Sequence, residues 1–131
     1  MESQKILVDT DLLIDFLRRK AGAKEQLEAA SRNGDLSVSV VTLAEILAGM
    51  RPDEKEATEE LIAGLSLVSV SEVIARKAGE LRRDQKRVLL PDCLIAATAL
   101  IEECLLLTGN RRDYPFAELK FFQLTSRQNQ S

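Results

Sequence analysis

Four acidic residues of this chain occupy positions from which their carboxylates can act together. Each follows a predicted strand or stands near the start of a helix beside one; the four are Asp9, Glu45, Asp92 and Asp113. Sites in open parallel sheets form beyond the carboxyl ends of the strands, so we expect these side chains to meet at one edge. Their charges would repel unless cations neutralised them, and such hard oxygen ligands suit Mg²⁺ or Mn²⁺.

Each acid also has an ordinary structural role open to it. Asp9 could cap the helix that follows it, and Thr42 with Glu45 fits a capping box. Asp92 could complement a helix dipole, and Asp113 could be a turn residue. These roles do not explain why all four acids occupy the same kind of topological position. An unpaired carboxylate at the end of an apolar strand is costly, which favours a shared site.

The 131 residues include no histidine, which removes several other chemistries. Ser-His-Asp and Cys-His nucleophiles, His-containing zinc sites and nucleases that use imidazole as acid and base are excluded. Cys93 and Cys104 are too few for a disulfide framework or a four-cysteine metal site, and we interpret them as buried thiols in a reducing cytoplasm. If the protein is an enzyme, carboxylates must carry the reaction.

The elements that must position the acids alternate between strand and helix. Short apolar or β-prone runs predict strands at 5–9, 36–41, 67–70, 105–108 and 121–124. Helical patterns predict helices at 10–20, 23–33, 42–50, 53–63, 71–87 and 91–103. This alternation indicates βαβ units. We therefore predict an α/β fold with a mainly parallel central sheet of about five strands and helices on both faces.

Length and composition indicate a single domain, which we place at residues 1–125, followed by a polar tail at 126–131. At 45% hydrophobic and 30% charged residues, the chain has the balance of a soluble globular protein. No stretch reaches the ~18 apolar residues of a membrane span, and the first residues are polar without a signal-peptide pattern. We expect no association with a membrane.

Four segments of the chain resemble the PIN-domain ribonucleases, and specifically the VapC-type toxins of bacterial and archaeal toxin–antitoxin pairs. They are residues 6–11 (ILVDTD), 42–49 (TLAEILAG), 90–99 (LPDCLIAATA) and 107–114 (LTGNRRDY). The segments stand in family order and span nearly the whole chain. The third and fourth patterns are fairly specific to the family, and the four together are strong.

The resemblance implies that Asp9, Glu45, Asp92 and Asp113 form an acidic cluster that binds divalent metal, with Mg²⁺ as the expected ion and Mn²⁺ as a substitute. Metal-assisted hydrolysis of a phosphodiester bond follows, because a bound ion lowers the pKa of water and offsets charge on the scissile phosphate. Asp9 and Asp92 are expected as direct ligands. The other two acids could ligate, hold a water molecule or help to take its proton.

Two further positions match residues that support the cluster by hydrogen bonding, namely Thr108 and Asn110. Two others depart from the family pattern. Asp11 stands where a neutral polar residue is common, so it adds charge near the metal and is a candidate outer ligand. Tyr114 replaces the usual phenylalanine, and we expect that change to matter little.

The expected substrate is RNA, and attack by water should leave a 5′-phosphate and a 3′-hydroxyl. Attack by the RNA's own 2′-oxygen typically relies on histidine, which the chain lacks. The net charge of −3 opposes binding to a polyanion, but two Mg²⁺ would change it to +1. Arg111 and Arg112, next to Asp113, are the expected phosphate contacts. With 4% aromatic residues, recognition should rest on RNA shape and backbone rather than on base stacking.

The resemblance also implies protein partners. Such toxins usually form homodimers and are held inactive by a small antitoxin in a hetero-oligomer, and only the antitoxin contacts DNA. An antitoxin segment could lie in a groove between helices, and apolar residues of the first two or three helices are candidate docking surface.

Two other functions fit parts of the sequence. A haloacid-dehalogenase-type phosphatase would use an Asp-x-Asp after a strand, which Asp9 to Asp11 imitates, but it also needs a lysine and a later acidic pair that we do not find. A receiver-type signalling module would need a phosphorylatable Asp at the end of the third strand. That strand is instead followed by Ser71 and Glu72.

Overall fold

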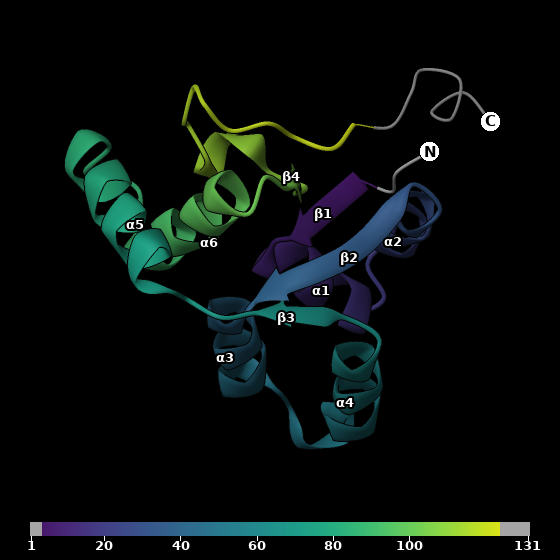
Figure 1. Cartoon of the computed structure of the whole chain (residues 1–131). Helices are drawn as coiled ribbons and strands as arrows, with labels where there is room; N and C mark the ends of the chain where they lie inside the picture. Colours follow the sequence, from purple (N-terminus) through teal and green to yellow (C-terminus); the bar gives the residue numbers. More distant parts are fainter. Residues whose placement is uncertain (1–3, 124–131) are drawn as a thin grey trace.

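The computed structural model describes residues 4–123, and within them the chain forms one four-stranded parallel sheet of order β3-β2-β1-β4 (Figure 1). The strands are β1 (Gln4–Val8), β2 (Gly34–Ser39), β3 (Ser66–Val68) and β4 (Leu105–Leu107). Ile6 in β1 is in register with Leu36 on one side and Leu105 on the other. The predicted α/β fold with a parallel sheet is therefore confirmed.

Six α-helices connect the strands. They are α1 (Thr10–Leu17), α2 (Ala23–Ser31), α3 (Val40–Gly49), α4 (Lys55–Ala63), α5 (Glu72–Asp84) and α6 (Leu90–Ile101). Two short 3₁₀ helices are η1 (Pro52–Glu54) and η2 (Arg111–Asp113). None of the helices in the described part of the chain is long and apolar enough to cross a membrane.

The helices cover both faces of the sheet, as predicted. Because side chains alternate along a strand, Leu7 and Leu106 point into a core shared with α5 and α6. Ile6 and Val8 point to the other face, into a core shared with α1, α2 and α3. Because β1 and β4 are parallel neighbours, their carboxyl ends lie at the same edge of the sheet.

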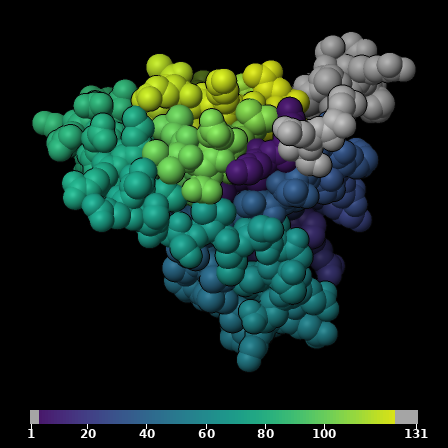
Figure 2. Space-filling model, in the orientation of Figure 1, coloured from purple at the N-terminus to yellow at the C-terminus, as the bar shows by residue number. Residues whose placement is uncertain are grey.

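The predicted fifth strand is reduced to a single bridge. Phe121 forms an isolated parallel bridge with Leu106, while the backbone N–H of Leu106 donates to the carbonyl of Lys120 and that of Phe122 donates to Leu106. Leu124 and the predicted tail at 126–131 lie outside the described residues. Figure 2 shows the segment before them, in yellow, packed along α6, where Phe116 and Leu119 are buried in the core.

Of the two helix caps suggested by the sequence, one is formed and one is not. Asp9 caps α1, since its side chain accepts the backbone N–H of Leu12. The capping box of Thr42 and Glu45 is not formed, because α3 begins earlier, at Val40, with Ser39 as its cap. Thr42 and Glu45 are thereby free to point their side chains toward α1.

Helix α5 starts after its predicted cap, Ser71, but ends at Asp84 rather than near Arg87. Gln85 leaves the helical region with φ −126° and ψ 75°. Residues 85–89 consequently form a loop that leads into α6. This loop, rather than a continuous helix, brings Arg87 to the edge of the sheet where the acids gather.

Candidate active site

The acids predicted from the sequence gather at the carboxyl edge of the sheet. A cavity of about 630 Å³ there is lined by Asp11, Glu45, Asp92 and Asp113. They come from the first turn of α1, from α3, from the first turn of α6 and from η2. Asp9, directly after β1, is 2% exposed and lies close enough to the cavity for its charge to interact with that of Asp92. The structure therefore brings all five carboxylates together.

Asp9 is held by donors on both oxygens. Its Oδ1 accepts the backbone N–H of Leu12 at 3.0 Å, and its Oδ2 accepts the hydroxyl of Thr108. Burial nevertheless raises the pKa of Asp9 to about 6, and the carboxylates of Asp11 and Asp92 add to this, against the lowering effect of the two hydrogen bonds. The capping role and the site role are therefore combined in one residue.

The two residues predicted to support the cluster do so differently. The Thr108 side chain contacts Asp9 directly. Asn110 is exposed, and its contribution is a backbone N–H that donates to Thr108 Oγ1 at 3.0 Å. Support from Asn110 thus reaches the acids through its backbone and Thr108, and it does not require the amide side chain.

Glu45 is held by a residue that the sequence patterns did not single out. The hydroxyl of Thr10 lies 2.6 Å from Glu45 Oε1 and 3.0 Å from the hydroxyl of Thr42. Thr10 and Thr42 are both buried, in the first turns of helices that follow the neighbouring strands β1 and β2. That shared position was the signal from which their proximity could have been inferred.

Asp92 is the acid most affected by its neighbours. Burial raises its pKa to about 6, and the charges of Asp113, Glu45 and Asp11 add to the effect. The Tyr114 hydroxyl acts in the opposite direction by interacting with the Asp92 carboxylate. Tyr114 is buried, so the hydroxyl that we expected to matter little lies beside a candidate ligand.

The structure separates the two arginines predicted to contact phosphate. Arg112 lines the acid cavity, whereas the guanidinium of Arg111 lies over the ring of Phe121, 5.0 Å from its centre. Arg87, on the loop between α5 and α6, lines the cavity opposite η2 together with the exposed Leu89. The basic groups available at the cavity are therefore Arg112 and Arg87.

The donor set fits a hard divalent cation in its chemistry. Oxygen ligands from several carboxylates are what such ions prefer. The pKa values of Asp9 and Asp92 are raised first by burial and then by neighbouring carboxylates, so a bound cation would favour their charged forms. Among residues 4–123, no group of three or more such side chains is already arranged to hold an ion. A shared ion therefore requires some side-chain rotation, and the partly exposed Asp92 and Asp113 line open space that permits it.

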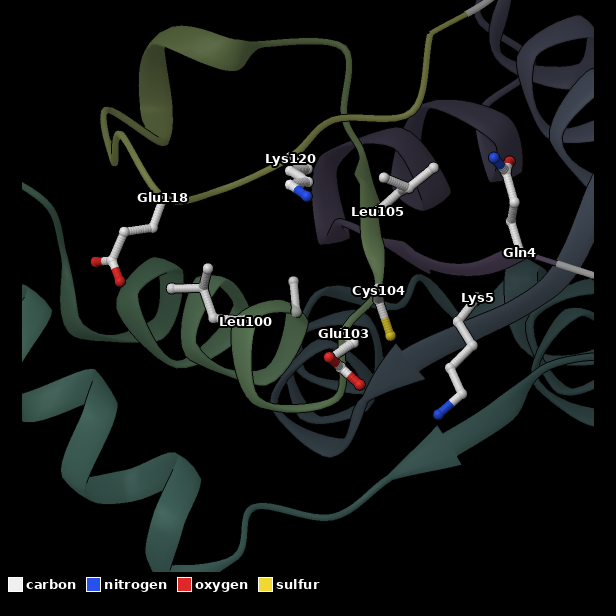
Figure 3. Close-up of a pocket in the computed structure, with 9 residues that line it drawn as sticks. Gln4, Lys5, Leu100, Glu103, Cys104, Leu105, Glu118 and Lys120 are labelled. Carbon is white, nitrogen blue, oxygen red and sulfur yellow. The ribbon is translucent and has the colours of Figure 1, made fainter.

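A second cavity, of about 590 Å³, lies at the other end of the strands. Its lining residues, drawn as sticks in Figure 3, are Gln4, Lys5, Ala99, Leu100, Glu103, Cys104, Leu105, Glu118 and Lys120. Its basic and acidic side chains are mixed, and Glu118 is paired with Lys77 at 3.3 Å. It contains none of the clustered acids and is separate from the candidate active site.

The fold and the acid cluster place the protein in a known class of α/β domain. The family model of the PIN domain matches residues 6–121, a range that contains all five clustered carboxylates. The chain belongs to the PIN-domain family. Members of the VapC ribonuclease type in this family generally depend on divalent metal ions.

Individual proteins and solved structures are also similar to this chain over most of its length. Ribonuclease VapC10 of Mycobacterium tuberculosis is 42% identical over 120 residues, which cover 88% of this chain and 90% of the relative. The structure of a toxin–antitoxin complex from Klebsiella pneumoniae is 28% identical, with a TM-score of 0.76 over 87% of this chain and 94% of that one. VapBC2 from Rickettsia felis, bound to a DNA fragment from its promoter, has a TM-score of 0.80 over 93% of this chain and 100% of that one. At 19% identity, this last likeness concerns the fold alone.

Proposed function

We propose that this chain is an endoribonuclease toxin of a toxin–antitoxin pair, which hydrolyses RNA phosphodiester bonds with the help of Mg²⁺ or, in its place, Mn²⁺. The observation that carries the proposal is the meeting of Asp9, Glu45, Asp92 and Asp113 around one cavity at the carboxyl edge of the sheet. The 42% identity to a ribonuclease across 88% of the chain supports it.

Asp9 and Asp92 are the proposed metal ligands, with Glu45 and Asp113 as further ligands or as holders of the attacking water. An ion bound there would lower the pKa of a water molecule and would offset charge on the scissile phosphate. Asp9 is fixed by its two donors, while Asp92 and Asp113 line the cavity and can adapt to substrate. Asp11 adds negative charge at the mouth and favours cation binding.

Arg112 and Arg87 are the proposed contacts to RNA phosphates. Both line the same cavity as the acids, so a backbone phosphate between them would lie next to the carboxylates. Lys and Arg contacts to phosphate provide sequence-independent affinity. We therefore propose recognition mainly through the shape and backbone of RNA.

A groove between α1, α2 and α4 is the proposed docking site of the antitoxin. Its cavity of about 490 Å³ has an apolar floor that includes Phe16, Leu17 and Ala57, and its rim carries Arg19, Lys20 and Lys24. An amphipathic segment with acidic flanks would complement this surface. The likeness to toxin–antitoxin complexes supports such a partner, and we propose that the toxin is also a homodimer, contacts DNA only through the antitoxin and works in the cytoplasm.

The test is incubation of the purified protein with a pool of structured RNAs in Mg²⁺ or Mn²⁺. Cleavage should be lost in EDTA and in Asp92→Asn, and should persist in the matched control Asp35→Asn, an exposed acid near the start of β2. Products should carry 5′-phosphate and 3′-hydroxyl ends. Cleavage that survives both EDTA and Asp92→Asn would refute the metal–carboxylate mechanism, and cyclic phosphate ends would refute attack by water.

A further inference from the structure

Three side chains from two neighbouring helices form a continuous hydrogen-bonded chain beside the acid cavity. Thr10 Oγ1 lies 2.6 Å from Glu45 Oε1 and 3.0 Å from Thr42 Oγ1. Thr42 is fully buried and Thr10 is 7% exposed, whereas Glu45 reaches the cavity wall. This series of hydrogen bonds therefore runs from the protein interior to the candidate active site.

The direction of these hydrogen bonds follows from counting protons. An ionised carboxylate only accepts, and each hydroxyl has one proton to donate. Thr10 must therefore donate to Glu45, and its oxygen then accepts the proton of Thr42. Hydrogen bonds to a charged acceptor are stronger than neutral ones, and the second hydroxyl polarises the first.

We propose that Thr10, with Thr42 behind it, is a positioning residue that holds the Glu45 carboxylate at the metal site. The inference rests on the proposed function, since it concerns the same cluster. Glu45 and Asp92 line the same cavity, so their like charges repel each other in the absence of an ion. Among residues 4–123, the Thr10 hydroxyl is the hydrogen-bond donor that holds the Glu45 carboxylate against this repulsion.

The arrangement parallels the hold of Thr108 on Asp9. In each case a hydroxyl at the carboxyl end of one strand fixes an acid carried by a neighbouring βα unit. Asp9 and Glu45 thus form a rigid half of the site, while Asp92 and Asp113, from α6 and η2, form an adaptable half. A rigid half allows an ion to be bound with less ordering of side chains at the moment of binding.

The experiment compares Thr10→Val, Thr10→Ser and Thr42→Val with the control Thr58→Val. Thr58 is a buried threonine on α4 that lies outside the acid cavity, so it reports on the same chemical change elsewhere. Mn²⁺ binding is measured by titration calorimetry without RNA, and RNA cleavage is measured separately. Circular dichroism and thermal unfolding establish that each variant is folded.

Thr10→Val should weaken Mn²⁺ binding and cleavage by about 10- to 100-fold, the range expected for loss of a hydrogen bond to a charged group. Thr10→Ser should stay within about threefold of wild type because it keeps the hydroxyl, and Thr42→Val should fall between them. Thr58→Val should match wild type in both assays. A folded Thr10→Val with wild-type Mn²⁺ affinity, or a Thr10→Ser that behaves like Thr10→Val, would overturn the proposal.

Crystal structures of metal-free wild type and Thr10→Val separate this inference from the proposed function. A Glu45 side chain that keeps its rotamer in Thr10→Val overturns the positioning role, whether or not RNA is cleaved. If the wild type cleaves no RNA but Glu45 rotates and Mn²⁺ binding weakens in Thr10→Val, the ribonuclease function fails and the positioning role stands.

Discussion

Asp9 shows how one side chain serves both folding and chemistry. Its carboxylate caps α1 through Leu12 and accepts the hydroxyl of Thr108, yet burial raises its pKa to about 6. The two hydrogen bonds recover part of the cost of burying the charge, and a cation would recover more. The uncompensated part of this cost lowers the stability of the metal-free protein, and it is consistent with the cation site proposed above.

The free-energy cost of burying the charged Asp92 carboxylate can be measured from the pH dependence of stability. Its pKa is 3.8 in the unfolded chain and about 6 in the folded protein, so the folded state binds the proton more tightly. The resulting stabilisation is complete below pH 3.8 and is lost as the pH rises through 6. In EDTA, Asp92→Asn should therefore raise the midpoint of thermal unfolding by several degrees at pH 8 and much less at pH 4, where Asp92 is protonated in the folded protein. A gain equal at the two pH values, or an equal gain in Asp35→Asn, would contradict this explanation.

The neighbouring arginines allow a paired comparison. Arg112 lines the acid cavity, while Arg111 lies over Phe121. Arg112→Ala should reduce kcat/KM for RNA by about 5- to 50-fold, mainly through KM, since one charge-assisted phosphate contact is lost. Arg111→Ala should affect cleavage less than threefold. Steady-state kinetics at two salt concentrations measure both, and the reverse order of effects would show that the phosphate contact is assigned to the wrong arginine.

At the scale of elements, the site depends on where helices begin and end. Because α5 ends at Asp84, the loop at 85–89 carries Arg87 to the acid edge. Because α3 begins at Val40, Thr42 and Glu45 face α1 instead of capping their own helix. Small shifts of helix boundaries therefore decide which side chains enter the site.

Helix α4 contains a buried polar atom that lowers stability. The hydroxyl of Thr58 is buried and has no hydrogen-bond partner among the described residues, and the cavity beside it measures about 10 Å³, at the lower limit for one water molecule. Thr58→Val should raise the free energy of unfolding by about 1 kcal/mol, because it removes an unsatisfied group and keeps the shape. Urea denaturation measures the change.

Thr98→Val is the matched control for that substitution. Thr98 is also buried in a helix, but its hydroxyl donates to the carbonyl of Leu94 at 2.7 Å. The same change there should leave the free energy of unfolding unchanged or lower it. Equal destabilisation by Thr58→Val and Thr98→Val would show that the Thr58 hydroxyl is satisfied in solution.

For the whole molecule, the proposed cation binding would be coupled to folding. The cluster unites residues from α1, α3, α6 and η2, so an ion held by it joins the two helical layers across the edge of the sheet. A ligand at 100 times its dissociation constant stabilises the folded state by about 2.7 kcal/mol. Saturating Mn²⁺ should therefore raise the unfolding midpoint by several degrees in wild type and by less in Asp92→Asn. No shift relative to NaCl of equal ionic strength would indicate that the cluster does not bind the ion.

The alternation of strands and helices and the positions of the acids relative to the strands follow from the amino-acid sequence, because both depend on local patterns. Apolar runs define β1 and β4, and an acid that directly follows β1 must lie at the carboxyl edge of a parallel sheet. The same local patterns predicted the ends of helices and strands less accurately. The helix predicted at 23–33 ends at Ser31, and Gly34 opens β2, where a Cβ atom would lie 2.0 Å from the carbonyl oxygen of Gln4.

Tertiary packing fixes which side chains hold the acids and which face the cavity. Thr10 and Glu45 are 35 residues apart, and Thr108 and Asp9 are 99 apart, so no local pattern records that they touch. The same is true of Arg111 and Arg112, which are adjacent and alike in sequence but separated by the turn of η2, one toward Phe121 and the other toward the acids. Such contacts depend on the packing of whole elements, which fixes where distant parts of the chain meet.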